Sequence, residues 1–360
     1  MGKMRIVVKI GSSSLTNDQG EIDQEKLTDH VLALASLKGE GHDVLLVSSG
    51  AVAAGFKRLG YPSRPVTLKG KQAAAAVGQG LLMQCYHEKF NEHHITPAQI
   101  LLTRSDFSNR NRYKNAYATM NELLDRNMLP VINENDSVAV EELTFGDNDL
   151  LSALVSGLIH ADMLIILTDI NGLYDADPRS DPKASRINEL VAISEEMMKA
   201  AEGAGTKVGT GGMKSKLNAA NMALSLGIPV FIGKGEGSSK LTEILVGSGD
   251  GTYIGRKGLS TISTHRQWIA FHSEVSGEIH IDQGAKQALL YNGKSLLSAG
   301  VSSVEGIFQP GDVVEVFCDD GLLGKGEVSC SSMELSKAMN SLQQHKNSTL
   351  VIHRNKWIKF

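Results

Sequence analysis

The stretch Ile6-Val7-Val8-Lys9-Ile10-Gly11-Ser12-Ser13-Ser14 begins as an apolar run and ends in a glycine and three hydroxyl side chains. Runs in which nearly every residue is large, apolar and often β-branched are typical of strands that are buried on both faces. A lysine at the end of such a strand, ahead of a glycine, can direct an ammonium and several backbone N–H groups at an anion. A plain strand and turn with a surface lysine fits this stretch about equally well.

Apolar runs of the same kind recur five times along the first two thirds of the chain, and helical patterns separate them. The runs are residues 44–47, 100–102, 129–132, 164–167 and 229–232, and the helical patterns cover residues 24–38, 71–90, 111–127, 149–159 and 214–226. This alternation predicts an α/β fold, with helices covering both faces of a mainly parallel sheet.

The last third of the chain has a different pattern. A chain of 360 residues is long for one hydrophobic core, which favours two domains. Short strand-like segments such as 278–281 and 313–316 are separated by glycines, which predicts a small, mostly β domain. The glycines, Ser and Thr of 247–263 look like the joint. We expect a first domain over 1–255, a linker over 256–272 and a second domain over 273–360.

Composition excludes several classes of protein. The formal net charge of −4 provides no basic field that would attract nucleic acid or a membrane. Cys85, Cys318 and Cys330 are scattered and form no CxxC pair, which argues against a disulfide framework or a zinc site. No signal-peptide pattern and no apolar run long enough to span a bilayer is present. We therefore expect a cytoplasmic protein without a membrane partner.

Small and polar residues cluster after the second and fourth apolar runs. Residues 48–55 (SSGAVAAG) leave room for a ligand to approach the backbone, although tight packing of a helix on the sheet explains them better when they are taken alone. Residues 133–137 (NENDS) and 146–149 (GDND) carry more carboxylates and amides than packing requires. They fit a ligand site better than the alternative, which is a set of turns and helix caps.

A further cluster follows the fifth run. It contains Thr168 and Asp169, then residues 171–174 and 177–179, and then the glycine-rich stretch 209–216 (GTGGMKSK) ahead of a helix. Backbone N–H groups and lysines in such a loop suit a phosphate group, and a mobile surface loop is an equally good reading. Because ligands bind at the carboxyl ends of strands in open α/β sheets, all these clusters are expected at one sheet edge.

Common nucleotide-binding and hydrolase motifs are absent. The P-loop pattern GxxxxGK[ST] fails because Met213 precedes Lys214-Ser215, and GxGxxG fails because three serines follow Gly11. Neither HExxH nor GxSxG occurs. The chain is therefore neither a P-loop NTPase nor a Rossmann dehydrogenase by its signature.

In combination and in their order, these stretches resemble the amino acid kinase family across most of residues 4–235. The stretches that carry the resemblance are residues 7–11, 48–55, 130–136, 146–149, 172–174 with 176–179, and 209–214. The C-terminal part resembles a PUA domain, a match that is more diffuse. The resemblance implies a three-layer α/β/α kinase domain followed by a small, mostly β, PUA-like domain.

The resemblance also implies an activity: ATP-dependent phosphorylation of the γ-carboxylate of L-glutamate, the first step of proline biosynthesis. The implied cofactors are ATP and Mg²⁺, with the metal held mainly by the nucleotide and by no metal site of the protein. The implied partners are further copies of the same chain in a homo-oligomer, a reductase that consumes the labile acyl phosphate, and proline as feedback inhibitor.

Carried over by motif, the residues with catalytic roles are Lys9, Lys216 and Asp149, and those that bind the substrate are Ser49, Gly50, Asp136 and Asn148. The ATP-binding residues are Lys9, Gly11, Thr168, Asp169, Thr210, Gly211, Gly212, Met213, Lys214, Ser215 and Lys216. Relatives often have Ser or Thr in place of Lys214, so the sequence leaves open which of Lys214 and Lys216 contacts the phosphate.

Two alternatives remain beside this prediction. Other members of the family act on acetylglutamate, aspartate or uridylate, and the stretch 132–136 together with the β-rich tail favours glutamate. A PUA-like domain also suggests RNA binding. Residues 271–360 contain eight basic and ten acidic residues, a net of −2, and this balance disfavours binding to a phosphate backbone.

Overall fold

The computed structural model describes residues 2–138, 148–176, 183–198, 212–255, 269, 273, 275–319, 321–341 and 348–359. The chain divides into two compact units. The first comprises Met1–Asp106 and Lys114–Thr261, and the second comprises Phe107–Tyr113 and Ile262–Phe360. The predicted linker, 256–272, lies outside the described residues except for Ile269.

The first unit is built around an eight-stranded sheet with the order β3-β4-β2-β1-β5-β9-β10-β8. Its strands are β1 (Arg5–Ile10), β2 (Asp43–Ser48), β3 (Pro97–Leu102), β4 (Leu129–Glu134), β5 (Met163–Leu167), β8 (Glu189–Leu190), β9 (Val230–Gly233) and β10 (Gly251–Ile254). The pairs from β3 through to β9 are parallel, and β10 is antiparallel to β9. The carboxyl ends of the central strands therefore share one edge.

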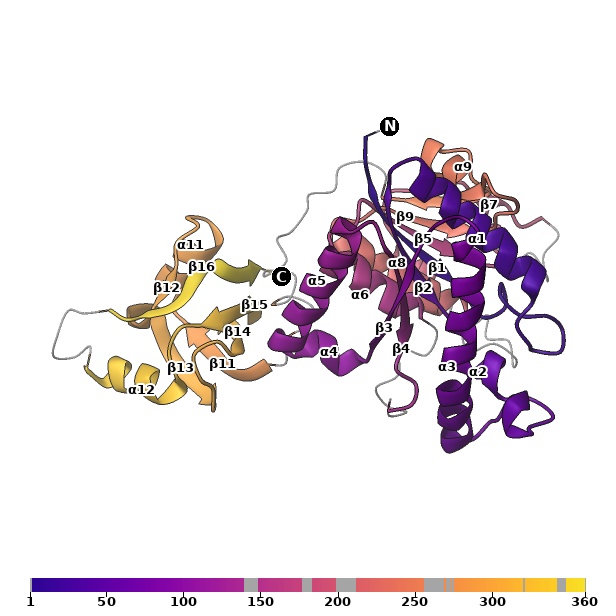
Figure 1. Ribbon diagram of the computed structural model, residues 1–360. Coiled ribbons are helices and arrows are strands. Elements are labelled where there is room, and N and C mark those ends of the chain that lie inside the picture. Colours follow the sequence, from indigo (N-terminus) through magenta and orange to yellow (C-terminus); the bar gives the residue numbers. More distant parts are fainter. Residues whose placement is uncertain are drawn as a thin grey trace. The chain divides into compact units, whose positions relative to one another are not determined.

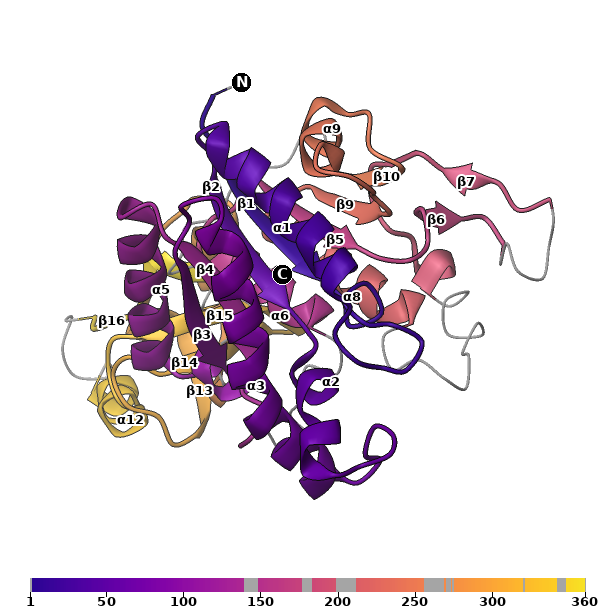
Figure 2. The same cartoon turned by 45° about the vertical axis from the view of Figure 1, so that its right-hand side comes forward.

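Helices cover both faces of this sheet, as Figures 1 and 2 show. The helices of the first face are α1 (Gln24–Gly39), α2 (Ala51–Gly55), α3 (Leu68–Asn91) and α9 (Lys240–Val246), and those of the second face are α5 (Arg110–Asp125), α6 (Asp149–Leu158) and α8 (Met213–Ser225). The short α4 (Arg104–Ser108) follows β3, and β6 (Leu173–Tyr174) pairs with β7 (Arg186–Ile187) in a separate ribbon. The predicted α/β/α layers are confirmed.

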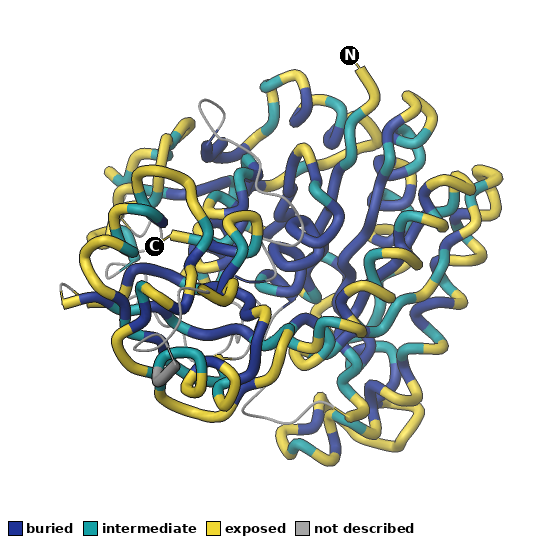
Figure 3. The backbone as a smooth tube through the Cα atoms, turned by 90° about the vertical axis from the view of Figure 1, so that its left-hand side faces the viewer, coloured by how far each residue is buried: buried dark blue, intermediate teal, exposed yellow. Residues whose placement is uncertain are grey.

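The central strands are buried because both of their faces lie under helices. In β1, every residue from Ile6 to Ile10 is buried, and β5 is buried throughout. Figure 3 shows the same strands as a continuous buried layer. Burial on both faces explains why these strands read as unbroken apolar runs and not as alternating patterns.

The local start of α1 follows from its cap. The carboxylate of Asp23 accepts hydrogen bonds from the backbone N–H groups of Glu25 and Lys26, which satisfies two donors that the helix leaves unpaired. The predicted helix over 24–38 and the observed one over Gln24–Gly39 thus begin at the same residue. The position at which α1 starts affects the site, because α1 packs against the segment that follows β1.

One expectation about the joint is wrong. Within the predicted joint 247–263, residues Gly251–Ile254 form β10, which belongs to the first sheet. A β-carbon on Gly251 would lie 2.5 Å from the Ile232 carbonyl oxygen, and one on Gly233 would lie 2.4 Å from that of Asp250. The glycines that suggested a linker therefore permit close approach of two strands.

The second unit contains a six-stranded sheet with the order β12-β16-β15-β14-β11-β13, and its described C-terminal segment also has two α-helices and the short 3₁₀ helix η4 (Ser298–Gly300). Its elements are β11 (Val275–Ile281), α11 (Gln283–Leu290), β12 (Leu296–Leu297), β13 (Val301–Gly306), β14 (Val313–Cys318), β15 (Gly321–Val328), α12 (Ser332–Ser341) and β16 (Leu350–Lys359). Its own core includes Ile279, Phe308 and Val316. The prediction of a mostly β domain is confirmed.

Candidate functional site

The parallel strands bring the predicted site residues to one edge of the first sheet. Lys9 lies near the end of β1, Ser49 follows β2, and Asp136 follows β4. Thr168 follows β5, and its N–H donates to the carbonyl of Gly233 at the end of β9, at 2.9 Å. This is the edge at which open α/β sheets bind ligands.

A buried charge cluster joins β1, α6 and α8 at this edge. Asp149 is the first residue of α6 and is fully buried. Its Oδ1 lies 2.6 Å from the Nζ of Lys9, and its Oδ2 lies 3.3 Å from the Nζ of Lys216 on α8. Lys9 and Lys216 are themselves 0% and 7% exposed. Two ammonium groups and one carboxylate carry a formal charge of +1, which an anion at this edge would complement.

Room beside this cluster depends on Gly11. A β-carbon on Gly11 would lie 3.3 Å from the Nζ of Lys9, so a larger residue there would crowd the ammonium group. Gly11 is buried directly after β1. The glycine that the sequence places after the first strand therefore leaves space for the lysine to turn back over the loop.

Asn148 occupies the centre of a polar network next to Asp149. Its Nδ2 donates to the carbonyl oxygen of Ser48 at 2.8 Å, to the Oγ of Ser49 at 3.2 Å and to the Oδ1 of Asn133 at 2.7 Å. Asn148 precedes α6 and is 6% exposed. With its amide nitrogen engaged by the protein, the Oδ1 acceptor of Asn148 is the part of this side chain suited to a ligand donor.

Sequence patterns did not indicate the residues that support this network. The Nδ2 of Asn133 donates to the Oε1 of Gln79 on α3 at 2.9 Å, and Gln79 donates in turn to Gln99 on β3 at 3.1 Å. The buried hydroxyl of Tyr86, also on α3, lies 2.7 Å from the Oγ of Ser48. Burial raises the pKa of Tyr86, so it stays protonated. Polar residues on the buried face of a helix were the available signal.

Gly50 allows a sharp turn between β2 and α2. Its φ of 111° lies in the region that favours glycine, and the short helix α2 begins at the next residue. Helix α2 then packs closely on α3, because β-carbons on Gly55 and Gly78 would lie 2.0 Å and 1.8 Å from carbonyl oxygens of the facing helix. The small residues of 48–55 were expected to pack a helix on the sheet, whereas Gly55 packs α2 on α3. This contact holds the turn that contains Ser49.

Asp136 is a half-buried carboxyl group after β4. Desolvation raises the pKa of Asp136 from 3.8 to about 6. A carboxylate that is poorly solvated gains from a cationic partner, and an α-ammonium group is a cation of suitable size.

The residues predicted to bind the nucleotide are only partly within the described chain. Thr168 is buried, and its hydroxyl donates to the exposed Asp169 at 3.1 Å. Thr210 and Gly211 lie outside the described residues, as do residues 146–147, 177–179 and 209 of the motifs.

The described end of the glycine-rich stretch leads directly into α8. Gly212 precedes the helix and is exposed, and Met213 and Ser215 are half-buried in its first turn. Lys214 is exposed, whereas Lys216 is buried against Asp149. Lys216 thus belongs to the buried charge cluster and Lys214 does not, and which of them contacts the phosphate stays a prediction.

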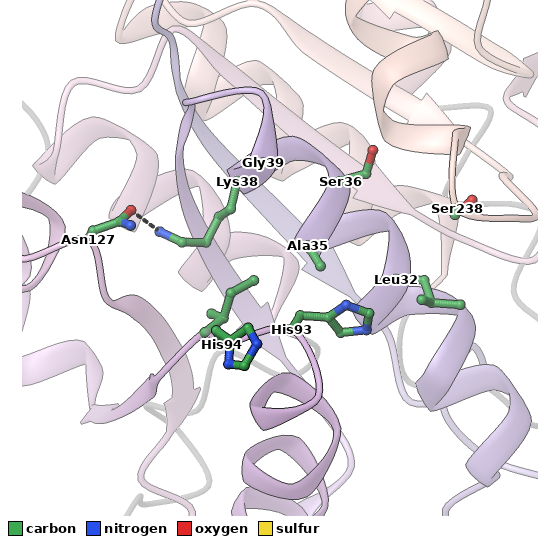
Figure 4. Close-up of a pocket in the computed structure, with 10 residues that line it drawn as sticks. Leu32, Ala35, Ser36, Lys38, Gly39, His93, His94, Asn127 and Ser238 are labelled. Atoms are coloured by element: carbon green, nitrogen blue, oxygen red, sulfur yellow. Dashed lines mark hydrogen bonds between the residues drawn. The ribbon is translucent and has the colours of Figure 1, made fainter.

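The described part of the first unit has one cavity beside this edge and another away from it. One of about 370 Å³ is lined by residues that follow β9, including Lys234, Glu236 and Asp250, and these were not predicted. The other, of about 490 Å³, lies mainly among residues at the C-terminal ends of helices, such as Lys38 and His93 (Figure 4). Those helix ends face the opposite sheet edge, so this second cavity is separate from the predicted site.

Among the described residues, no group of three or more His, Cys, Asp or Glu side chains is placed to hold a metal ion. The helices within the same parts of the chain are too short or too polar to cross a membrane.

Two protein-family profiles and several named proteins are similar to this chain. The profile of the amino acid kinase family matches residues 4–234, and that of the PUA domain matches residues 277–347. The protein named glutamate 5-kinase 1 from Bacillus licheniformis is 63% identical over 99% of both chains, and that from Bacillus subtilis is 61% identical over 99% of both. The solved structure of carbamate kinase from Giardia lamblia bound to AMP-PNP is 18% identical, covers 70% of this chain and 98% of its own, and has a TM-score of 0.48.

Proposed function

The chain belongs to the amino acid kinase family, and from this membership we propose that it transfers the γ-phosphoryl group of ATP to the γ-carboxylate of L-glutamate. The product is L-glutamyl 5-phosphate, the first intermediate of proline biosynthesis. The match to the proteins named glutamate 5-kinase over nearly the whole chain supports this substrate over acetylglutamate, aspartate and uridylate.

The arrangement of Lys9, Asp149 and Lys216 is the observation that carries the mechanism. A glutamate carboxylate is ionised at neutral pH, so the reaction needs no general base. Its obstacle is repulsion between two anions as negative charge spreads over the phosphoryl oxygens. Two ammonium groups oriented by one buried carboxylate neutralise that charge and require little rearrangement during the transfer. We assign this role to Lys9 and Lys216, and orientation of both lysines to Asp149.

The polar network around Asn148 supports a glutamate site beside the lysines. Asn148 and Asp136 offer oxygen acceptors for the α-ammonium group, and Ser49 and Gly50 offer a hydroxyl and a backbone N–H for a carboxylate. Because Asn148 precedes Asp149 in the chain, a glutamate bound by Asn148 would have its γ-carboxylate next to the phosphoryl group. Close positioning of two reactants is the second contribution to the rate.

ATP would lie along the rest of the edge. We assign its contacts to Gly11, Thr168 and Asp169, and to the start of α8 with the stretch Thr210–Lys216 as predicted. Mg²⁺ bound with the nucleotide would be held mainly by nucleotide oxygens and water, and would supply positive charge against the phosphates. The buried Asp149 does not fit as a metal ligand, because each of its oxygens already faces an ammonium group.

We further propose a domain division, a location and partners for this protein. The kinase domain covers residues 1–255, a linker covers 256–272, and the PUA-like domain covers 273–360. The protein acts in the cytoplasm as a homo-oligomer and is inhibited by proline. Its acyl phosphate product hydrolyses readily, so a glutamyl phosphate reductase is the natural consumer.

Glutamate-dependent formation of ADP tests the proposal, with hydroxylamine added to trap the acyl phosphate as a hydroxamate. The expected result is equal amounts of ADP and hydroxamate with glutamate, and neither product with acetylglutamate, aspartate or uridylate. ADP formation with one of those acceptors and none with glutamate would reassign the substrate.

A further inference from the structure

Thr252 on β10 is a buried polar residue that contacts both strands of the β6–β7 ribbon. It is 0% exposed, and its Oγ accepts a hydrogen bond from the backbone N–H of Leu173 at 2.8 Å. The same hydroxyl group donates to the carbonyl oxygen of Ile187 at 2.5 Å. Leu173 and Ile187 are register partners in the ribbon. One hydroxyl group therefore binds a backbone group of each strand and holds the ribbon against β10.

Gly172 allows the chain to pass close to this hydroxyl group. Its φ of 120° lies in the region that favours glycine. A β-carbon on Gly172 would lie 2.7 Å from the Oγ of Thr252 and 3.1 Å from the Thr252 backbone nitrogen. This close contact accounts for the glycine that begins the motif 172–174, to which the proposed mechanism assigns no role.

The turn Asp169–Gly172 is held at both of its ends. Before the turn, the N–H of Thr168 donates to the carbonyl oxygen at the end of β9 at 2.9 Å. After it, the N–H of Leu173 donates to Thr252. Because only four residues separate these two bonds, a shift at one end must move the backbone between them. Asp169, which is assigned to ATP, is the first residue of this turn.

Other contacts of the turn are more exposed than the bond to Thr252. The guanidinium group of Arg186 on β7 donates to the carbonyl oxygen of Asn171 at 3.4 Å and forms an ion pair with Asp250. The Nδ2 of Asn171 also donates to Asp250 at 3.4 Å. The Asp250 side chain is 54% exposed, and ion pairs in contact with water contribute little. The buried bond to Thr252 is therefore expected to contribute most to holding the turn.

We propose that Thr252 is a positioning residue that holds the turn after Thr168 in the conformation that binds ATP. This inference rests on the proposed function, because it takes Thr168 and Asp169 to contact the nucleotide. Thr252 acts through the N–H of Leu173 and not by contact with a substrate. Without the hydroxyl group, this buried N–H loses its partner, and the turn leaves the position at which Asp169 meets ATP.

The test compares Thr252→Val, which keeps the shape of the side chain without the hydroxyl group, with Thr252→Ser, which keeps the hydroxyl group. Thr252→Val is expected to lower kcat/KM for ATP about tenfold, the effect of one buried hydrogen bond, and to leave the KM for glutamate unchanged. Thr252→Ser should keep most of the wild-type value. Arg186→Met, which removes a partly exposed contact to the same turn, should show a smaller loss of the same kind.

Ser298→Ala is the matched control. Ser298 is also 0% exposed, and its hydroxyl oxygen accepts from the N–H of Thr349 at 3.0 Å. It belongs to the second unit, which the proposed mechanism does not use. Its replacement should lower the melting temperature and leave kcat/KM for ATP as in the wild type.

Three kinetic results would overturn the proposal. The first is normal kcat/KM for ATP in Thr252→Val, or in Arg186→Met if Thr252→Val does not fold. The second is an equal rise in the KM values for ATP and glutamate. The third is a loss in Thr252→Ser as large as that in Thr252→Val, which would assign the effect to the packing of the side chain and not to its hydroxyl group.

Calorimetric titration with MgATP in the absence of glutamate separates this inference from the proposed function. Thr252→Val should bind MgATP several-fold more weakly than the wild type and the Ser298→Ala control. A wild type that binds MgATP but shows no glutamate-dependent turnover would overturn the proposed substrate alone. Unchanged MgATP affinity in Thr252→Val, with normal glutamate turnover in the wild type, would overturn the role of Thr252 alone.

Discussion

The ammonium groups of Lys9 and Lys216 lie against opposite oxygens of one carboxylate, at 2.6 Å and 3.3 Å from Asp149. One lysine comes from the first strand and the other from a helix late in the first unit. Neither the strand nor the helix alone creates a phosphate site. The start of α6, which lies between them, brings the two charges together.

Removing either ammonium group should mainly slow phosphoryl transfer. Lys9→Met and Lys216→Met are each expected to lower kcat on the order of 10²-fold or more, as for loss of a preorganised transition-state donor. Steady-state ADP formation measures the effect, and Lys71→Met, at an exposed position of α3, is the control. Turnover near the wild-type value in both variants would remove these lysines from the mechanism.

Neutralising Asp149 should affect stability as well as rate. Asp149→Asn leaves two ammonium groups buried without their shared carboxylate, which is expected to lower the free energy of unfolding by about 3–5 kcal/mol. Urea denaturation measures this change. The control is Glu122→Gln, which removes an exposed ion pair with Arg126 on α5 and should cost about 0–1 kcal/mol. Equal losses in the two variants would contradict the buried ion-pair assignment.

Substitution of Asp136 should change the KM for glutamate much more than the KM for ATP. Asp136→Asn removes the negative charge assigned to the α-ammonium group of glutamate. We expect the KM for glutamate to rise on the order of tenfold or more, as for loss of a charge-assisted hydrogen bond, with the KM for ATP little changed. Initial rates over a grid of both substrate concentrations give the two values. A similar rise in both would place Asp136 outside the glutamate site.

The raised pKa of Asp136 predicts a pH dependence of glutamate binding. Its pKa of about 6 in the free protein means that the carboxyl is protonated below this pH and attracts an ammonium group weakly. The KM for glutamate should therefore rise as the pH falls from about 7 to about 5, where the glutamate γ-carboxylate is still largely ionised. Asp136→Asn should not show this rise. A flat wild-type profile would rule out Asp136 as the titrating group.

The same pKa has a consequence for stability. Between pH 3.8 and about pH 6, the folded protein binds more protons at Asp136 than the unfolded chain does. This group therefore subtracts stability as the pH rises through that interval, the reverse of a carboxylate in an ion pair. Thermal unfolding of the wild type and Asp136→Asn across this interval should show the difference.

The contact between α2 and α3 should tolerate no side chain at Gly78. A β-carbon there would lie 1.8 Å from the carbonyl oxygen of Ala51, so Gly78→Ala must displace α2 together with the neighbouring Ser49. We expect lower stability and a higher KM for glutamate. Gly80→Ala, on the same helix with nothing within 4 Å, should instead stabilise the protein by about 1 kcal/mol. Stabilisation by both substitutions would show that the two helices separate easily.

Much of the fold could be predicted because the decisive residues are local in sequence. The strands around Val7, Leu45 and Ile165 are buried on both faces, which leaves an uninterrupted apolar signature. The short strand β10 was missed because Gly251 serves close approach of two backbones, and glycine has the same appearance in a linker. Its assignment depends on the neighbouring β9, which the local sequence does not reveal.

The site was predictable only where its residues follow strands. Lys9, Ser49 and Asn148 stand in recognisable clusters at strand or helix ends, and their roles stay predictions until the variants are measured. Gln79 and Tyr86 were missed because both lie on a helix that also contributes to the core. A buried polar residue in that position has no distinctive spacing, and its partner, Asn133 or Ser48, is distant in sequence.

Asn148 and Asp149 are consecutive residues, yet one is bonded to the side proposed for the amino acid and the other to the side proposed for the nucleotide. Both side chains are attached to the same short stretch of backbone at the start of α6, so we expect a shift of one to move the other. Affinity for one ligand should therefore depend on occupancy by the other, and a double-mutant cycle between Ser49 and Lys216 should give a non-zero interaction energy although the two side chains belong to different elements. Selection acting on one ligand site would in this way also alter the other.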